Sequence, residues 1–209
     1  MSRARLEIFS DAVLAVAITL LALDLQVKGP GHGSIASLLL HEWPALTAYV
    51  ISFFTIGTVW VNHHALLANV ELVDRLLLFF NLILLMFVVL IPQATRLLAA
   101  YLPGGGSGAR VAAVVYGIVL EGMSVGFILM VEWMFRSKWT RPSIPVNRRW
   151  AGRRRYYVAP VVYLAIVGFA FVYPLTALIL SAAVNVYYAF EQTPARTRGV
   201  VDPGVAGGD

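Results

Sequence analysis

Long apolar runs separated by short polar or glycine-rich stretches dominate the chain. Each run predicts a helix that crosses a bilayer, because about 20 apolar residues at ~1.5 Å each cover the ~30 Å hydrocarbon core. The expected spans are residues 4–27, 43–66, 75–101, 110–135, 156–173 and 175–191. Such runs are too long for barrel strands. The pattern therefore predicts an all-α integral membrane protein with one six-helix domain over residues 1–191, followed by a disordered tail at 192–209 that is rich in Pro, Gly and Arg.

The first run, residues 5–27, has two unlike faces when it is projected as a helix at ~100° per residue. One face is an apolar stripe with a single hydroxyl, made of Ala12, Val16, Thr19, Leu20, Leu23 and Val27. Asp11 lies roughly 140° from Val16 in this projection, so we expect it to point away from the stripe and into the protein. The stripe alone is open to two interpretations, a surface that contacts lipid or another helix and a pore lining.

Composition narrows the class of protein. The chain is 59% hydrophobic and 13% charged, whereas soluble domains average roughly 25% charged residues. It contains no cysteine, which excludes disulfides, thiolate metal sites and cysteine nucleophiles. The glycine-rich turn at residues 102–109 does not carry the Lys and Ser/Thr of a phosphate loop. With no nucleophile–base pair or metal-ligand spacing either, we expect a membrane protein that is not an enzyme and needs no cofactor.

The basic residues set the orientation. With the N-terminus inside, the outer segments carry only Lys28, Arg96 and Arg110 of the 16 Lys and Arg residues. The inner segments carry Arg3, Arg5, Arg75, Arg136, Lys138, Arg141, Arg148, Arg149, Arg153, Arg154, Arg155, Arg196 and Arg198. This asymmetry predicts that both termini are cytoplasmic. We expect the cluster Arg148–Arg155 to contact anionic lipid headgroups rather than nucleic acid.

With this orientation, polar side chains from four spans fall at one depth in the membrane. They are Arg5, Asp11, Asn62, His63, Asn81 and, at the edge of the set, Asn185. An unpaired polar group at that depth costs several kcal/mol, so we expect a shared hydrogen-bonded cluster. It is either a structural lock between helices or a gating or proton-sensing element in which a histidine titrates. A metal site at His63 and His64 is disfavoured, because adjacent helical residues point about 100° apart.

Glu121 stands apart, near the middle of the fourth span. An intramembrane glutamate is a functional candidate by default. It supports a rival interpretation of the chain as a proton-coupled secondary transporter, although such transporters usually contain inverted repeats and none is evident here. An interaction protein without transport activity is a further alternative.

The segment Arg5-x-x-x-Phe9-Ser10-Asp11 resembles the signature of the TMEM175 family of potassium channels, in its bacterial branch. The likeness continues through AVLAVAITLLALDL in the first span, TVWVNHHALL in the second, FFNLILLMFVVLIP in the third and YYVAPVVYL at the start of the fifth. It covers essentially the whole membrane region. The resemblance implies a bacterial inner-membrane channel that is a homotetramer of six-span subunits, with the first helix of each lining a central pore.

The resemblance also implies roles for individual residues. The family has no TVGYG-type filter, and none occurs here. Its constriction is made by apolar side chains, with Val16 at the narrowest ring, where Ile or Leu is more usual, and Thr19, Leu20 and Leu23 in further layers. The polar network expected from the resemblance and the depth count comprises Arg5, Phe9, Ser10, Asp11, Trp60, Asn62, His63 and Asn81. Together these features predict passive K⁺ permeation with modest selectivity, because K⁺ sheds water more readily than Na⁺ at an apolar neck.

Overall fold

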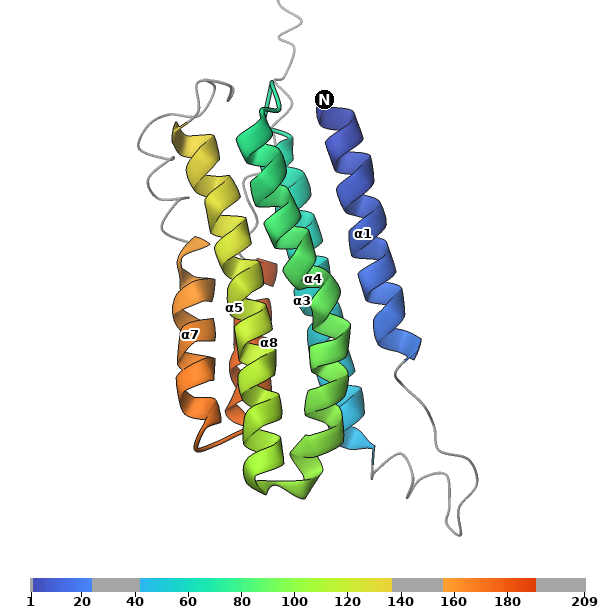
Figure 1. The fold of residues 1–209 in the computed structure, drawn as a ribbon, viewed down its shortest axis with the longest axis vertical. Coiled ribbons are helices and arrows are strands. Elements are labelled where there is room, and N and C mark those ends of the chain that lie inside the picture. Colours follow the sequence, from blue (N-terminus) through green and yellow to red (C-terminus); the bar gives the residue numbers. More distant parts are fainter. Residues whose placement is uncertain (1, 24–41, 137–155, 191–209) are drawn as a thin grey trace, which may run out of the picture.

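The apolar runs form long helices that lie roughly side by side (Figure 1). The computed structural model describes residues 2–23, 42–136 and 156–190. The helices in these ranges are α1 (Arg3–Leu23), α3 (Trp43–Leu67), α4 (Arg75–Tyr101), α5 (Gly106–Arg136), α7 (Val158–Ala170) and α8 (Thr176–Phe190), and the short 3₁₀ turn η1 (Leu102–Gly104) joins α4 to α5. The all-α architecture with six helices is therefore confirmed in the described part of the chain.

The six helices differ in length. Four candidate spans have the length and apolarity to cross a membrane, namely α1, α3, α4 extended by η1, and α5, with 21, 25, 30 and 31 residues. The helices α7 and α8 have only 13 and 15 residues, about 20 and 23 Å at ~1.5 Å per residue. The helix α7 is shorter than the expected span 156–173, whereas α8 begins within one residue of the expected span 175–191. The helix α7 ends at Ala170, and a turn over residues 171–173 leads to Pro174, which disfavours helical backbone at Tyr173.

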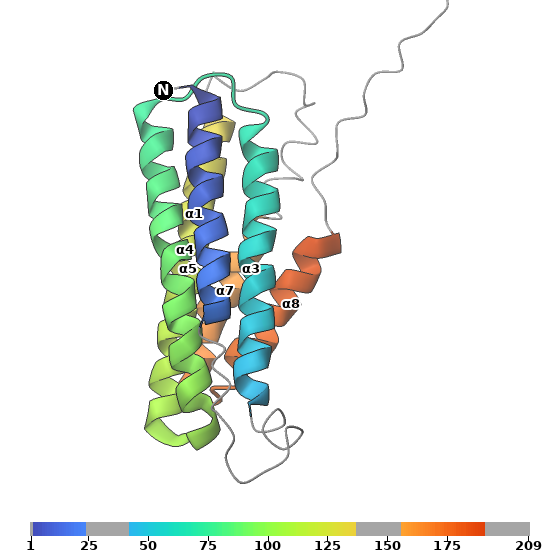
Figure 2. The ribbon, with the colours of Figure 1, turned by 90° about the vertical axis from the view of Figure 1, so that its right-hand side faces the viewer.

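The helix α1 lies at one edge of the bundle, as Figures 1 and 2 show. It packs against α3 and α4, while α4 forms a long antiparallel pair with α5. The helices α7 and α8 lie on the far side and pack against α5, α3 and each other. The bundle therefore covers only one side of α1.

Glycines bring α5 close to its two neighbours. A Cβ atom added at Gly126 would lie 2.8 Å from both the Cα and the N of Leu84 on α4. A Cβ added at Gly117 would lie 3.0 Å from Cγ2 of Val167 on α7. Small residues of this kind let membrane helices approach closely and pack by van der Waals contact. The close packing of α5 against α4 and α7 thus depends on glycine, which has no side chain, at positions 126 and 117.

Asp74 fixes the end of the bundle at which α4 begins. Its Oδ1 accepts a hydrogen bond from the backbone N of Leu77 at 2.8 Å, which caps α4. Its Oδ2 accepts from Nε1 of Trp133 near the end of α5 at 3.0 Å. One carboxylate therefore satisfies a free N–H of the first turn of α4 and ties the two central helices together.

Candidate functional site

The helix α1 has one buried and one exposed face. The buried residues follow helical spacing and face α3 and α4; they are Leu6, Ser10, Leu14, Ala17 and Leu21. The opposite face is uncovered in a single chain: Val16 is 56% exposed, Leu20 37% and Leu23 70%. An apolar surface this large on one helix needs lipid, another protein chain or a pore beside it.

All four residues predicted to line a pore lie on this exposed face of α1, and Ala12 lies there too. Thr19 is exposed, and its Oγ1 donates a hydrogen bond to the backbone O of Val16 at 2.8 Å. The hydroxyl hydrogen is thus used within the helix, and the oxygen presents lone pairs to the outside. Val27, the last member of the predicted stripe, lies outside the described residues, as do Arg148–Arg155 and the predicted tail.

A buried chain of hydrogen bonds joins α1, α3 and α4. Nε2 of His63 lies 2.8 Å from Oδ1 of Asn81. Nδ2 of Asn81 donates to Oγ of Ser10 at 3.1 Å, and Ser10 Oγ donates to the backbone O of Leu6 at 2.8 Å. If Nε2 of His63 carries the hydrogen, all three side chains are satisfied in one direction, from α3 through α4 to α1. We call His63, Asn81 and Ser10 the inner polar cluster.

A second polar contact holds α1 against α3. Nε1 of Trp60 donates to Oδ1 of Asp11 at 3.0 Å. Asp11 is half-buried, and it points toward α3, away from the exposed stripe. Trp60 is 46% exposed, so this contact lies at the border between the packed and the uncovered faces of α1. Together with the inner polar cluster it fixes the rotation of α1 about its own axis.

The other predicted members of the network lie elsewhere. Arg5 and Phe9 are exposed on α1. Nδ2 of Asn62 donates to the backbone O of Thr58 at 2.8 Å, on a side of α3 away from α1. The physical reason is helical geometry: consecutive residues diverge by about 100°, so His63 reaches Asn81 while its neighbours Asn62 and His64 do not. Equal depth in the membrane does not place two side chains on the same face.

A second buried polar cluster was not predicted. The hydroxyls of Thr95, Ser52 and Tyr116 form a row, with Thr95 Oγ1 2.8 Å from Ser52 Oγ and Ser52 Oγ 3.1 Å from Tyr116 OH. It joins α4, α3 and α5. Uncharged hydroxyls give little signal in a sequence, because Ser and Thr in membrane helices commonly bond to their own backbone, as Thr95 also does with Ile91 O at 2.8 Å.

Asn185 belongs to this second region rather than to the inner polar cluster. Its Nδ2 donates to the backbone O of Ile51 at 2.9 Å and to Oγ1 of Thr55 at 3.0 Å. These bonds attach α8 to α3. Asn185 therefore does not bond to the cluster with which the depth count grouped it, and instead forms a separate contact between α8 and α3.

Glu121 on α5 has an incompletely paired carboxyl. Its Oε2 is buried and has no hydrogen-bond partner among the described residues. No group of three His, Cys, Asp or Glu side chains that could hold a metal ion occurs in the described ranges. Glu121 is therefore an intramembrane acid that stands apart from the two hydrogen-bonded clusters.

Comparison with known proteins adds a family match. The family model described as "Endosomal/lysosomal potassium channel TMEM175" matches residues 5–92, which include α1, α3 and most of α4. A potassium channel of Streptomyces collinus is 39% identical over 201 residues, covering 95% of this chain and 97% of that protein. The endosomal/lysosomal proton channel TMEM175 of Gallus gallus is 36% identical over 110 residues, covering 48% of this chain and 22% of that protein.

A solved structure shows the same fold. It is the crystal structure of a lysosomal potassium-selective channel TMEM175 homolog from Chamaesiphon minutus, with a TM-score of 0.76 and 31% sequence identity. The match covers 90% of this chain and 96% of that one. The similarity therefore extends over most of both chains.

Proposed function

Because this chain belongs to the TMEM175 family, we propose that it is a potassium channel in which K⁺ passes between the α1 helices of four assembled copies. The observation that carries the proposal is the uncovered stripe of α1 formed by Val16, Thr19, Leu20 and Leu23. The related potassium channel of Streptomyces collinus matches this chain over 97% of its own length, which supports a common activity.

The stripe suits an apolar neck. Val and Leu side chains offer no oxygen to replace the hydration shell of an ion, so discrimination rests on the cost of dehydration, and a dry neck gates by dewetting. K⁺ sheds water more readily than Na⁺, which predicts modest selectivity. The lone pairs of the Thr19 oxygen, whose hydrogen is bonded to Val16 O, lie between the Val16 and Leu23 levels of the stripe. This oxygen is the polar atom of the stripe that K⁺ can contact within the neck.

The polar contacts of α1 have a supporting role in this proposal. Ser10 of the inner polar cluster and the contact Trp60–Asp11 lie one to two helical turns before Val16. They hold the rotation of α1 so that its apolar stripe faces the axis. A helix that is free to turn would present Ala17 or Ile18 to the ions instead.

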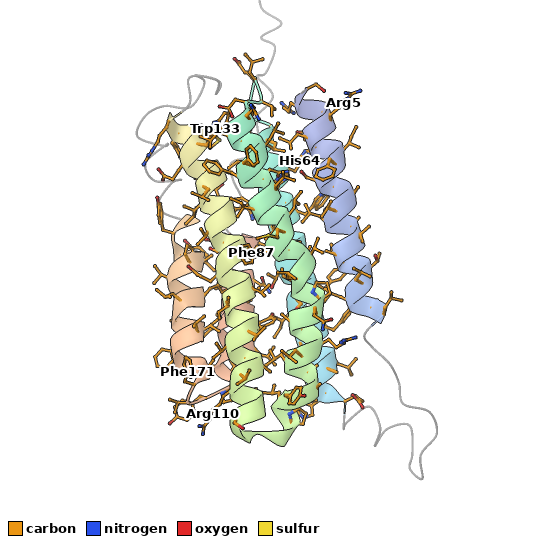
Figure 3. The ribbon with its side chains drawn as sticks, in the orientation of Figure 1. Arg5, His64, Phe87, Arg110, Trp133 and Phe171 are labelled. Atoms are coloured by element: carbon orange, nitrogen blue, oxygen red, sulfur yellow. The ribbon has the colours of Figure 1, made fainter. Side chains whose placement is uncertain are left out.

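Orientation and location follow from the charges at the two ends of the bundle. Arg5 lies at the end where α1 begins, and Arg110 lies at the opposite end (Figure 3). The first end also holds Arg75 and Arg136, at the start of α4 and the end of α5. By the positive-inside rule the end with Arg5 is cytoplasmic, and the bacterial relative from Streptomyces collinus supports the bacterial cell membrane as the location.

The test is ion flux through purified protein in liposomes. We expect Val16→Ala and Leu20→Ala to raise K⁺ flux several-fold and to bring Na⁺ flux closer to it, because a wider neck costs less dehydration. Val161→Ala and Leu164→Ala on α7 are the matched controls, since these side chains are 69% and 63% exposed and lie far from α1. If all four variants conduct like the unchanged protein, the stripe does not line the pore.

Proton permeation is a second candidate activity. The Gallus gallus relative is named a proton channel, and Glu121 offers an intramembrane acid with an unpaired oxygen. A pH-sensitive dye inside the same liposomes measures H⁺ entry when a K⁺ gradient sets the voltage. If H⁺ passes through the neck of α1, Leu20→Ala changes H⁺ flux and Glu121→Gln does not. The reverse result supports the proton-coupled transporter that uses Glu121.

A further inference from the structure

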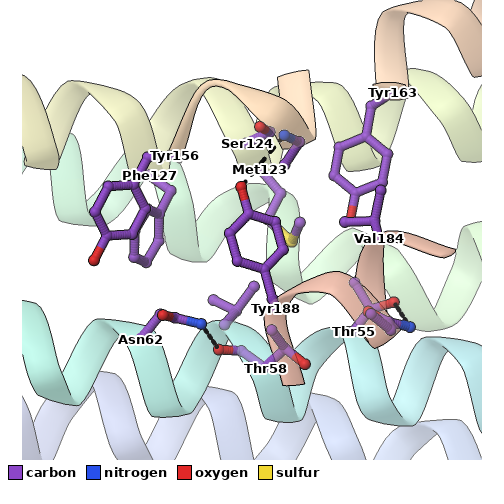
Figure 4. A pocket seen from close by; sticks show the side chains of 13 residues that line it. Thr55, Thr58, Asn62, Met123, Ser124, Phe127, Tyr156, Tyr163, Val184 and Tyr188 are labelled. Carbon is purple, nitrogen blue, oxygen red and sulfur yellow. Dashed lines mark hydrogen bonds between the residues drawn. The ribbon is translucent and has the colours of Figure 1, made fainter. Parts of the chain in front are cut away.

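A cleft opens between α3, α5, α7 and α8, on the side of the bundle away from α1 (Figure 4). Its buried floor includes Ser124 and Tyr163, and its partly exposed mouth includes Thr58, Asn62 and Tyr188. The volume of the cleft is about 50 Å³. No lining residue belongs to α1 or α4, so the cleft is separate from the proposed pore surface.

The shape of the cleft follows from the course of α8. Asn185 ties α8 to α3 through Ile51 and Thr55, and beyond that point α8 diverges from α3 toward the end of the bundle where α1 begins (Figure 2). Asn185 and Thr55 therefore close the deep end of the cleft. The tilted rings of Phe127 and Tyr156, 5.6 Å apart between centroids, form a wall near the other end.

The cleft contains polar groups that the described residues leave unpaired. Ser124 and Tyr163 are 4% and 2% exposed, and neither hydroxyl forms a hydrogen bond to any residue in the described ranges. The Oδ1 of Asn62 and the hydroxyl of Thr58 are likewise unused there, although Asn62 donates to the backbone O of Thr58. In Figure 4 the ring of Tyr188 lies between Asn62 on α3 and Tyr163 on α7. Several unpaired polar groups around one cavity require an occupant that both donates and accepts.

We propose that this cleft is a hydrated site, filled by a small cluster of water molecules that enter from the end of the bundle where α1 begins. A water molecule needs about 10–15 Å³ of such space and two to four polar partners, so the cavity holds about three or four. Aromatic guests are too large, because a cavity that binds benzene measures about 150 Å³. The described lining residues carry no charged side chain, so the site takes neutral hydrogen-bonding molecules rather than ions.

The absence of cysteine from the chain allows a direct test. A thiol reacts with methanethiosulfonates as the thiolate, which forms where water reaches it. Ser124→Cys is nearly isosteric and places the thiol on the cleft floor. Val125→Cys is the matched control, because the adjacent side chain is 42% exposed but faces away from the cleft. Ser52→Cys is the second control, buried in the other polar cluster.

The reagent is methyl methanethiosulfonate, which is small and uncharged as the site requires, applied to the protein in lipid nanodiscs and followed by intact-protein mass spectrometry. We expect Ser124→Cys to be modified more than tenfold faster than Val125→Cys or Ser52→Cys. Equal rates at Ser124→Cys and either control overturn the proposal, because reactivity then reflects general opening or lipid-side access. Thr58→Cys at the mouth is a second cleft variant, used if Ser124→Cys does not fold. If Thr58→Cys reacts no faster than the controls, the proposed hydration of the cleft is also overturned.

Discussion

At the scale of single residues, Asn81 is the most constrained polar side chain of the described ranges. It is fully buried, accepts from His63 on α3 and donates to Ser10 on α1. Both functions of the amide are used, the oxygen as an acceptor and the nitrogen as a donor. The amide therefore explains why three helices meet at this depth without a charge.

Replacing Asn81 by Ala should lower stability markedly. The change leaves Nε2 of His63 without its acceptor and Ser10 Oγ without its donor, and an unsatisfied buried group costs about 1–3 kcal/mol. Asn69→Ala is the control, since Asn69 is only half-buried and bonds to the backbone of its own segment at Ala65 O, 2.9 Å. Fluorescence-detected size-exclusion after heating should show a lower midpoint for the Asn81 variant alone. Equal midpoints would mean that water replaces the lost amide.

Asp11 permits a test of charge against hydrogen bonding. Its Oδ1 accepts from Trp60 Nε1 at 3.0 Å, a role that the amide oxygen of Asn fills equally well. We expect Asp11→Asn to keep K⁺ flux within about twofold of the unchanged protein, and Asp11→Ala to alter flux strongly because α1 loses its rotational anchor. Flux and size-exclusion profile are measured together on both variants. A large loss in Asp11→Asn would show that the negative charge, rather than the accepted hydrogen bond, is what the site needs.

At the scale of helices, the contact between α4 and α5 depends on Gly126. A Cβ atom there would lie 2.8 Å from backbone atoms of Leu84, which cannot move aside as a side chain would. Gly126→Ala should therefore separate the two helices and lower the thermal midpoint, despite the better helix propensity of Ala. Gly168→Ala on α7 is the control, because nothing lies within 4 Å of its added Cβ, and Ala there should be neutral or stabilise by up to about 1 kcal/mol. A stable Gly126 variant would mean that α4 and α5 can slide apart without cost.

The helices themselves could be predicted from the sequence because apolar runs of this length have few other solutions in a bilayer. The expected first four spans agree with α1, α3, α4 and α5 to within a few residues at the ends that the structure describes. The end of α7 and the start of α8 near Pro174 were harder to predict, because the sequence stays apolar through the turn although the helical backbone is interrupted there.

At the scale of the whole molecule, the exposed face of α1 was predictable and the partners of its polar face were only partly so. Helical projection needs only the order of residues along one helix, which is why Val16 and Asp11 lie on the faces expected. Pairing between helices depends on their relative rotation, which one sequence does not contain. Depth alone thus grouped Asn62 with His63, and it gave no sign that Ser52, Thr95 and Tyr116 would meet.

The tetramer and the pore can be tested on one variant. Thr19→Cys places the only thiol of the chain on the proposed axis, and four copies bring four thiols to one ring. A cationic trimethylammonium methanethiosulfonate would leave fixed positive charges in a neck of low dielectric, where like charge strongly repels K⁺. We therefore expect K⁺ flux to fall more than tenfold after treatment and to recover when a reducing agent removes the adduct. Leu164→Cys on α7 should show no change.

Assembly is measured separately, by light scattering on the purified protein in detergent, where the protein mass should be four times the 22.9 kDa of one chain. A mass of 22.9 kDa would rule out the shared axis whatever the flux shows. If the Thr19→Cys variant is a tetramer but its K⁺ flux does not change with the reagent, the proposed assembly is correct and the ions pass somewhere other than the α1 stripe. A tetramer whose K⁺ flux is blocked by the reagent has its α1 stripes around the ion path. A thiol at position 19 that faced lipid would not ionise and react, because no water would reach it, and a charge attached there would not lie in the path of K⁺.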